Sequence, residues 1–77
     1  MTDIKSAVEY IIKAIVTDSD NIEITTHEEN QLLIIDINAP SEIVGQIIGK
    51  DGKIIKSIRT LLNLAFPDTR YLLQIKE

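Results

Sequence analysis

Two glycines stand three residues apart, at Gly49 and Gly52, between two stretches whose apolar residues recur with helical spacing. The first stretch, residues 41–48, follows Pro40 and opens with Ser-Glu, which favours the start of a helix. The second stretch covers residues 53–65. Because glycine accepts backbone conformations that a β-carbon opposes, the pair predicts a tight turn joining two helices. A turn without side chains at its two ends also lets another backbone come close to it.

The apolar spacing outside this segment predicts one more helix and three strands. The helix covers residues 3–16. Alternating residues predict a half-buried strand over 22–27, a turn at 28–30, and a second strand over 31–39 that is apolar enough to be central. A last strand covers residues 70–75. The expected order is α-β-β-α-α-β, which is an α+β fold.

The two longer helices are each expected to bury one apolar stripe. In the helix over 3–16 this stripe consists of Ile4, Val8, Ile11 and Ile15. In the helix over 53–65 it consists of Ile54, Ile55, Ile58, Leu61, Leu62 and Ala65. Leu64 lies on the opposite, polar arc and Phe66 follows the helix end, so this region holds more apolar residues than one small core needs.

The composition excludes several classes of protein. A chain of 77 residues, of which 44% are apolar and 26% charged, is typical of one globular domain over residues 1–77. It has no cysteine, which excludes disulfides and thiolate metal sites. His27 is its single histidine and no Ser-His-Asp grouping is suggested, so we expect no enzyme, metal, cofactor or small-molecule substrate. Without a basic leader or a long apolar run, we expect a cytoplasmic protein with no signal peptide or membrane span.

Positive charge is concentrated around the glycines, although the whole chain has a net charge of −4. Residues 46–60 hold four basic side chains against one acidic side chain, a local charge of +3. The remaining residues hold four basic and eleven acidic side chains. The basic residues of this stripe are Lys50, Lys53, Lys56 and Arg59. A polyanion is therefore expected to bind at the basic stripe.

The glycine segment also suits contact with phosphate groups. Backbone N–H groups at the start of a helix carry partial positive charge, to which Lys50 and Lys53 add full charges. The chain lacks the G-x-x-x-x-G-K-[ST] pattern and no strand leads directly into the loop, so an NTP site is not expected. A sugar–phosphate backbone fits better, with Val44, Ile47 and Ile48 as an apolar wall for bases.

Residues 44–53 (VGQIIGKDGK), placed between two helices that are flanked by strands, resemble the GxxG segment of a KH domain. The helix and strand before the β-α-α-β core resemble the type II arrangement. Together with Ala39-Pro40, the Ile58-Arg59-Thr60 stretch and the chain length, these features are similar to the small bacterial KhpA family of stand-alone KH proteins. The resemblance covers the whole chain and implies a three-stranded sheet covered on one face by helices.

The resemblance also implies a ligand and the residues that bind it. In KH domains the GxxG loop clamps the backbone of about four nucleotides, and the bases stand in an apolar groove. The implied RNA-binding residues here are Val44, Ile47, Ile48, Gly49, Lys50, Asp51, Gly52, Lys53, Lys56 and Arg59. The implied role is that of a post-transcriptional regulator or RNA chaperone acting on single-stranded RNA. Asp51 departs from the family, whose loops often carry a neutral or basic residue there, and its charge opposes phosphate.

Plainer interpretations exist for the same residues. Gly49 is compatible with an ordinary helix C-cap, Gly45 with close packing, and the basic stripe with a solvated helix face. The alternative function is a protein-interaction module that mainly dimerises or docks a partner. The resemblance implies a homodimer and pairing with a larger KH-containing protein of the KhpB (Jag) type. The candidate contact residues are Leu61, Leu64 and Phe66, with the far sheet face at Leu32 and Ile34 as second choice.

Overall fold

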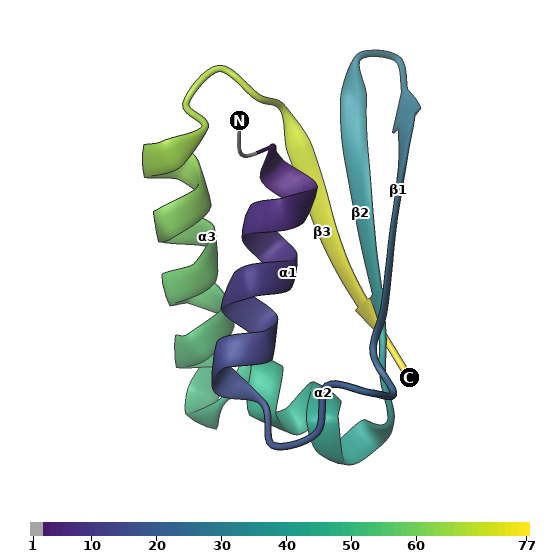
Figure 1. Cartoon of the computed structure of the whole chain (residues 1–77). Helices are drawn as coiled ribbons and strands as arrows, with labels where there is room; N and C mark the ends of the chain where they lie inside the picture. Colours follow the sequence, from purple (N-terminus) through teal and green to yellow (C-terminus); the bar gives the residue numbers. More distant parts are fainter. Residues whose placement is uncertain (1–2) are drawn as a thin grey trace.

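In the computed structural model, which describes residues 3–77, the helices lie on one side of a three-stranded sheet (Figure 1). A 3₁₀ turn, Lys50–Gly52, separates α2 from α3. The elements are α1 (Ile4–Ile15), β1 (Glu23–Glu29), β2 (Leu32–Asn38), α2 (Ser41–Ile48), α3 (Lys53–Ala65) and β3 (Tyr71–Lys76). The α-β-β-α-α-β order is confirmed. Both α2 and α3 begin and end at the predicted residues, because Pro40 and Gly49 bound α2, Gly52 precedes α3 and Pro67 follows its end.

The strand order in the sheet is β1-β2-β3, so β2 is the central strand, as predicted. β1 pairs antiparallel with β2, whereas β3 pairs parallel with it. Parallel neighbours cannot be joined by a tight turn, because the chain must first return to the starting edge of the sheet. Here α2, the glycine turn and α3 make that return. It brings Tyr71, at the beginning of β3, opposite Leu33 of β2.

The hairpin between β1 and β2 turns later than predicted. Its turn residues are Asn30 and Gln31, with φ angles of 51° and 67°. Glu29, which was expected in the turn, instead pairs with Leu32 as part of the strand. Two successive left-handed residues match the twist of the flanking strands, and asparagine accepts this conformation more readily than most residues.

The centre of the core lies between the sheet and the helices and is aliphatic. Ile35 and Ile37 of β2 are fully buried and face the helices. The helices and β3 contribute Ile4, Val8, Ile12, Ile43, Ile47, Ile55, Ile58, Leu62 and Leu73 to the same buried cluster. Burial of each large aliphatic side chain stabilises the fold by roughly 1.5–3 kcal/mol relative to leaving it exposed. Apolar contacts from α1, α2 and α3 therefore hold the helices, and with them the glycine turn, against the sheet.

The predicted apolar stripes were only partly correct. In α1 the buried side chains are Ile4, Val8 and Ile12, whereas Ile15 is exposed. In α3 they are Ile55, Ile58 and Leu62, whereas Ile54, Leu61 and Ala65 are exposed. A three-stranded sheet covers only one narrow arc of each helix, so side chains at the edge of a wide apolar stripe stay in contact with solvent. Both helices consequently carry apolar side chains on the surface.

Candidate nucleic-acid interface

The turn between α2 and α3 is built from left-handed backbone conformations. Gly49 ends α2 with φ 75° and ψ 177°, and its N–H donates to the Gly45 carbonyl at 2.9 Å. Gly52 has φ 71° and donates to the Gly49 carbonyl at 3.2 Å. Asp51 also has a positive φ, of 57°, a conformation that a short polar side chain adopts more easily than most. This backbone explains why an aspartate fits at position 51 despite its charge.

The three glycines are required to different degrees. A β-carbon on Gly49 would lie 2.6 Å from Cγ1 of Ile54, and the φ angle there is also unfavourable for other residues. A β-carbon on Gly52 would meet only Cγ2 of Ile55, at 3.9 Å, so backbone conformation is its main constraint. Gly45 is exposed and a β-carbon there would meet nothing within 4 Å, so the close-packing interpretation of Gly45 is wrong.

The start of α3 has backbone N–H groups that no side chain caps. Its N-cap residue is Gly52, and its first turn contains no acidic residue. In α1, by contrast, the Asp3 carboxylate accepts a hydrogen bond from the Ser6 N–H at 2.8 Å, and this bond lowers the pKa of Asp3. Lys50 and Lys53 are exposed beside the uncapped end of α3. The Lys53 N–H donates to the Lys50 carbonyl, whereas no side chain occupies the helix start. The turn therefore combines the partial positive charge of a helix start without a side-chain cap and two ammonium groups, a combination suited to phosphate oxygens.

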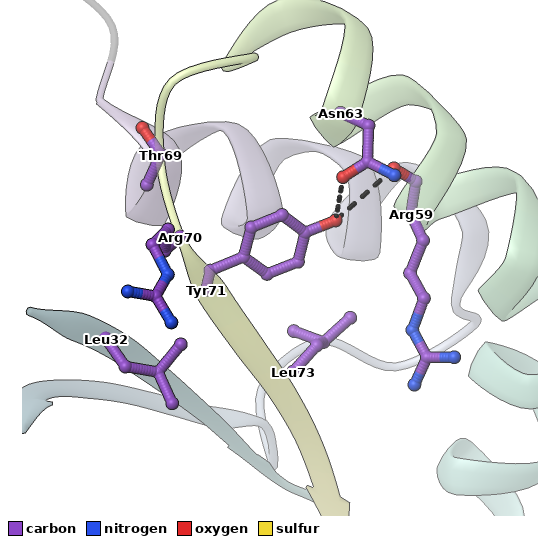
Figure 2. A pocket seen from close by; sticks show the side chains of 7 residues that line it. All are labelled: Leu32, Arg59, Asn63, Thr69, Arg70, Tyr71 and Leu73. Carbon is purple, nitrogen blue, oxygen red and sulfur yellow. Dashed lines mark hydrogen bonds between the residues drawn. The ribbon is translucent and has the colours of Figure 1, made fainter.

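The basic stripe continues along one flank of α3. Lys56, Arg59 and Asn63 follow each other at spacings of three and four residues, so they share one side of the helix. Lys56 and Arg59 are exposed. Arg59 and Asn63 line a hollow between α3 and β3, which shows that this flank of the helix faces the edge of the sheet (Figure 2).

The predicted apolar wall beside the turn consists of residues in three different environments. Ile48 is 38% exposed and Val44 is partly buried against the core, so both present surface next to the turn. Ile47 is 0% exposed. The burial of its side chain excludes direct contact with a ligand, since Ile47 packs inside the core cluster. Its part at the site is to hold α2, and hence the glycine turn, against the rest of the domain.

The candidate contact residues at the end of α3 also differ from each other. Leu61 is 53% exposed and Leu64 is 76% exposed, so both are available on the surface. Phe66 is partly buried and packs against the core, because the chain turns toward the sheet directly after α3. The adjacent helix α1 carries a further exposed aromatic side chain, Tyr10. The accessible apolar surface thus consists of Tyr10, Leu61 and Leu64 rather than Phe66.

The sequence interpretation missed the hollow between α3 and β3 and three residues that line it, Asn63, Thr69 and Arg70. Asn63 could have been noticed, because it lies four residues after Arg59 on the same helical flank. Thr69 and Arg70 gave no such signal, since the parallel pairing of β3 is what carries them to α3. Within residues 3–77 no group of three potential metal ligands occurs. None of the described helices is long and apolar enough to cross a membrane.

Comparison with known proteins identifies relatives along most of the chain. The KH domain of KhpA and KhpB matches residues 5–75. The RNA-binding protein KhpA of Caldanaerobacter subterraneus subsp. tengcongensis is 38% identical over 58 residues, which cover 75% of this chain and 77% of the relative. The RNA-binding protein KhpA of Treponema pallidum is 37% identical over 68 residues, covering 86% and 85%. That of Borreliella burgdorferi is 30% identical over 69 residues, covering 90% and 84%.

The match to a KH domain agrees with the α+β fold described above. No solved structure is significantly similar to the chain. The relatives are named as RNA-binding proteins and none of those compared above is named as an enzyme, in agreement with the prediction that this chain is not an enzyme. The matched segment contains nearly all of α1 and β3 and every element between them. The chain therefore belongs to the KhpA/KhpB family of KH domains.

Proposed function

We propose that this protein binds single-stranded RNA through the Gly49–Gly52 turn and the adjacent flank of α3. The observation that carries the proposal is the uncapped start of α3, which stands beside Lys50 and Lys53 in a chain that is acidic elsewhere. Phosphate oxygens would accept hydrogen bonds from the backbone N–H groups and pair with the two ammonium groups. The relatives' name, RNA-binding protein, supports the same ligand.

The bases of the bound strand would lie against the apolar surface that Val44 and Ile48 present beside the turn. Aromatic stacking plays no part there, because the described residues around the turn include no aromatic side chain. Lys56 and Arg59 extend the positive charge away from the turn along α3. The resulting role is that of a cytoplasmic RNA chaperone or post-transcriptional regulator with modest sequence preference.

The salt dependence of binding tests this proposal. Few cations are available, so the logarithm of the binding constant should fall with the logarithm of salt concentration with a slope magnitude of about 1–3. Fluorescence anisotropy measures the salt slope and the affinity for a short unstructured RNA and for the same RNA in a duplex. We expect the single strand to bind more tightly than the duplex, because only unpaired bases can reach the apolar wall. Equal affinity for the two forms, or binding that is independent of salt, would contradict the proposal.

We also propose that two copies of the chain form a homodimer through α1 and α3, which run side by side (Figure 1). Leu64 protrudes from α3, while Ser6, Ala7, Tyr10 and Ile11 of α1 line an apolar hollow of about 470 Å³. In the proposed two-fold contact, Leu64 of each copy would enter the α1 hollow of the other copy. A larger KH-containing protein of the KhpB type could use the same surface.

Sedimentation equilibrium with two matched variants tests the dimer. Leu64→Glu places a charge in the proposed contact and should give a monomer. Leu72→Glu, at a side chain that is 41% exposed on the opposite face of the sheet, should leave the dimer intact. If only Leu72→Glu dissociates the protein, the interface lies on the far sheet face. A native chain that is monomeric at high micromolar concentration excludes the dimer.

A further inference from the structure

A hollow of about 390 Å³ lies between the second half of α3 and the beginning of β3 (Figure 2). Its lining residues are Leu32, Arg59, Asn63, Thr69, Arg70, Tyr71 and Leu73. Leucine side chains and the ring of Tyr71 supply apolar surface, and the other four residues supply polar groups. A hollow that combines flat apolar surface with several polar groups has the composition expected of a site for a small planar ligand.

The polar groups of the hollow are held in a defined orientation. The Tyr71 hydroxyl donates to Oδ1 of Asn63 at 2.8 Å and lies 3.3 Å from the carbonyl oxygen of Arg59. The Tyr71 hydroxyl is protonated and able to donate at neutral pH, since the ordinary pKa of tyrosine is near 10 and burial raises it further. Because Oδ1 of Asn63 is occupied as an acceptor, the Nδ2 group remains as a free donor. Tyr71 thus determines which end of the Asn63 amide is available to a ligand.

Hydrogen-bond donors predominate in the hollow. The guanidinium groups of Arg59 and Arg70 only donate, and the free end of Asn63 only donates. The acceptors among the lining side chains are fewer: the hydroxyl oxygens of Thr69 and Tyr71 and the second lone pair of Asn63 Oδ1. A ligand group that donates hydrogen bonds therefore finds fewer partners here than a carbonyl oxygen or a phosphate oxygen, which can accept from several donors.

The hollow lies on the path that a strand clamped at the glycine turn would follow. Lys56, Arg59 and Asn63 share the flank of α3 that faces β3. Ten residues separate Lys53 at the turn from Asn63, a rise of about 15 Å along a helix. An extended strand that contacts Lys53 and then Arg59 therefore reaches Asn63.

We infer that this hollow receives one base of the bound RNA and prefers a base with a carbonyl oxygen at pyrimidine position 4 or purine position 6, as in uracil and guanine, over one with an amino group at that position, as in cytosine and adenine. The inference rests on the proposed RNA binding and adds a preference to it. Uracil O4 and guanine O6 are acceptors and match the free Nδ2 donor of Asn63, whereas the arginines would pair with phosphate oxygens whatever the base. The amino group of cytosine N4 or adenine N6 cannot accept a hydrogen bond from Nδ2 of Asn63, so this donor would be left without a partner, which costs binding free energy.

Comparison of eight-nucleotide oligouridine and oligocytidine tests this preference, because the two have the same backbone and ring size. The native protein should bind oligouridine about fivefold more tightly, the ratio expected for one net hydrogen bond of about 1 kcal/mol. Asn63→Ala should bring the ratio to about one by weakening oligouridine only. Tyr71→Phe should reduce the ratio as well, since it releases the Asn63 amide. Arg70→Gln should weaken both oligonucleotides equally and lower the salt slope by about 0.7.

The outcomes separate the two proposals. If neither oligonucleotide binds the native protein, the RNA-binding proposal fails and the base preference fails with it. If both bind equally and Asn63→Ala changes neither affinity, RNA binding stands and the assignment of this hollow is wrong. Urea denaturation of each variant shows whether it is folded. Should Tyr71→Phe fail to fold, Asn63→Ala, an exposed position, still decides the matter.

Discussion

Lys50→Asp is expected to lower RNA affinity at least tenfold and to leave the fold intact. Lys50 is exposed in the glycine turn, so replacing it disturbs no packing. The substitution removes a cation from the phosphate path and places a second carboxylate beside Asp51. A hydrogen bond to a charged group contributes about 1.5–3 kcal/mol, which corresponds to roughly 10–100-fold in affinity before repulsion is added.

The control for this variant is Lys5→Asp on α1, which makes the same change of charge away from the turn. If RNA binds at the glycine turn, Lys5→Asp should change RNA affinity only slightly. The affinities of Lys50→Asp and Lys5→Asp are measured by anisotropy at the same salt concentration. Equal losses in the two variants would mean that net charge, rather than the glycine turn, governs binding. Asp51→Asn adds the complementary test, because asparagine tolerates the left-handed backbone and removes the negative charge, so binding should tighten.

The second large effect concerns stability. Ile47→Ala should lower the free energy of unfolding by about 2–5 kcal/mol, because it removes a fully buried side chain and leaves a cavity. A domain of this length has a total stability of roughly 4–12 kcal/mol, so the loss is a large part of it. The neighbouring Ile48→Ala, at a side chain that is 38% exposed, should cost less than about 1.5 kcal/mol.

Urea denaturation followed by circular dichroism, at one protein concentration for all variants, measures both changes. RNA affinity, measured for the folded Ile47→Ala and Ile48→Ala variants, should show the larger loss for Ile48→Ala. Folded Ile48→Ala should bind RNA more weakly, since it removes part of the apolar wall. Similar stability losses for the two alanine variants would contradict the assignment of Ile47 to the core and Ile48 to the surface.

Local signals in the sequence were sufficient for the element order and for the helices around the turn. Pro40, Gly49 and Gly52 each act through backbone geometry that does not depend on distant residues, so both ends of α2 and the start of α3 were predicted to the residue. The turn of the β-hairpin was placed too early. Its location depends on Asn30 and Gln31 both taking left-handed conformations, which the acidic pair before them obscured.

Periodicity alone could not decide which part of an apolar stripe the sheet would cover. Ile54 and Leu61 have helical spacing relative to the buried residues of α3, yet both are exposed at the edge of the contact. The same limit applies to Ile47, which was expected both to pack in the core and to line the apolar wall, but whose side chain is fully buried in the core. The hollow at Asn63 and Arg70 depends on the parallel pairing of β2 with β3, which joins residues far apart in the sequence.

Amide chemical shifts recorded while a short unstructured RNA is titrated into the protein test the proposed binding site most directly. We expect the largest shifts at Gly49–Lys53, with further shifts along α3 at Lys56, Arg59 and Asn63, and all of them should diminish as salt is raised. The exposed outer side of α1, including Tyr10, should remain unperturbed. Shifts confined to α1 or to the far face of the sheet, with none at Gly49–Lys53, would contradict RNA binding through the glycine turn.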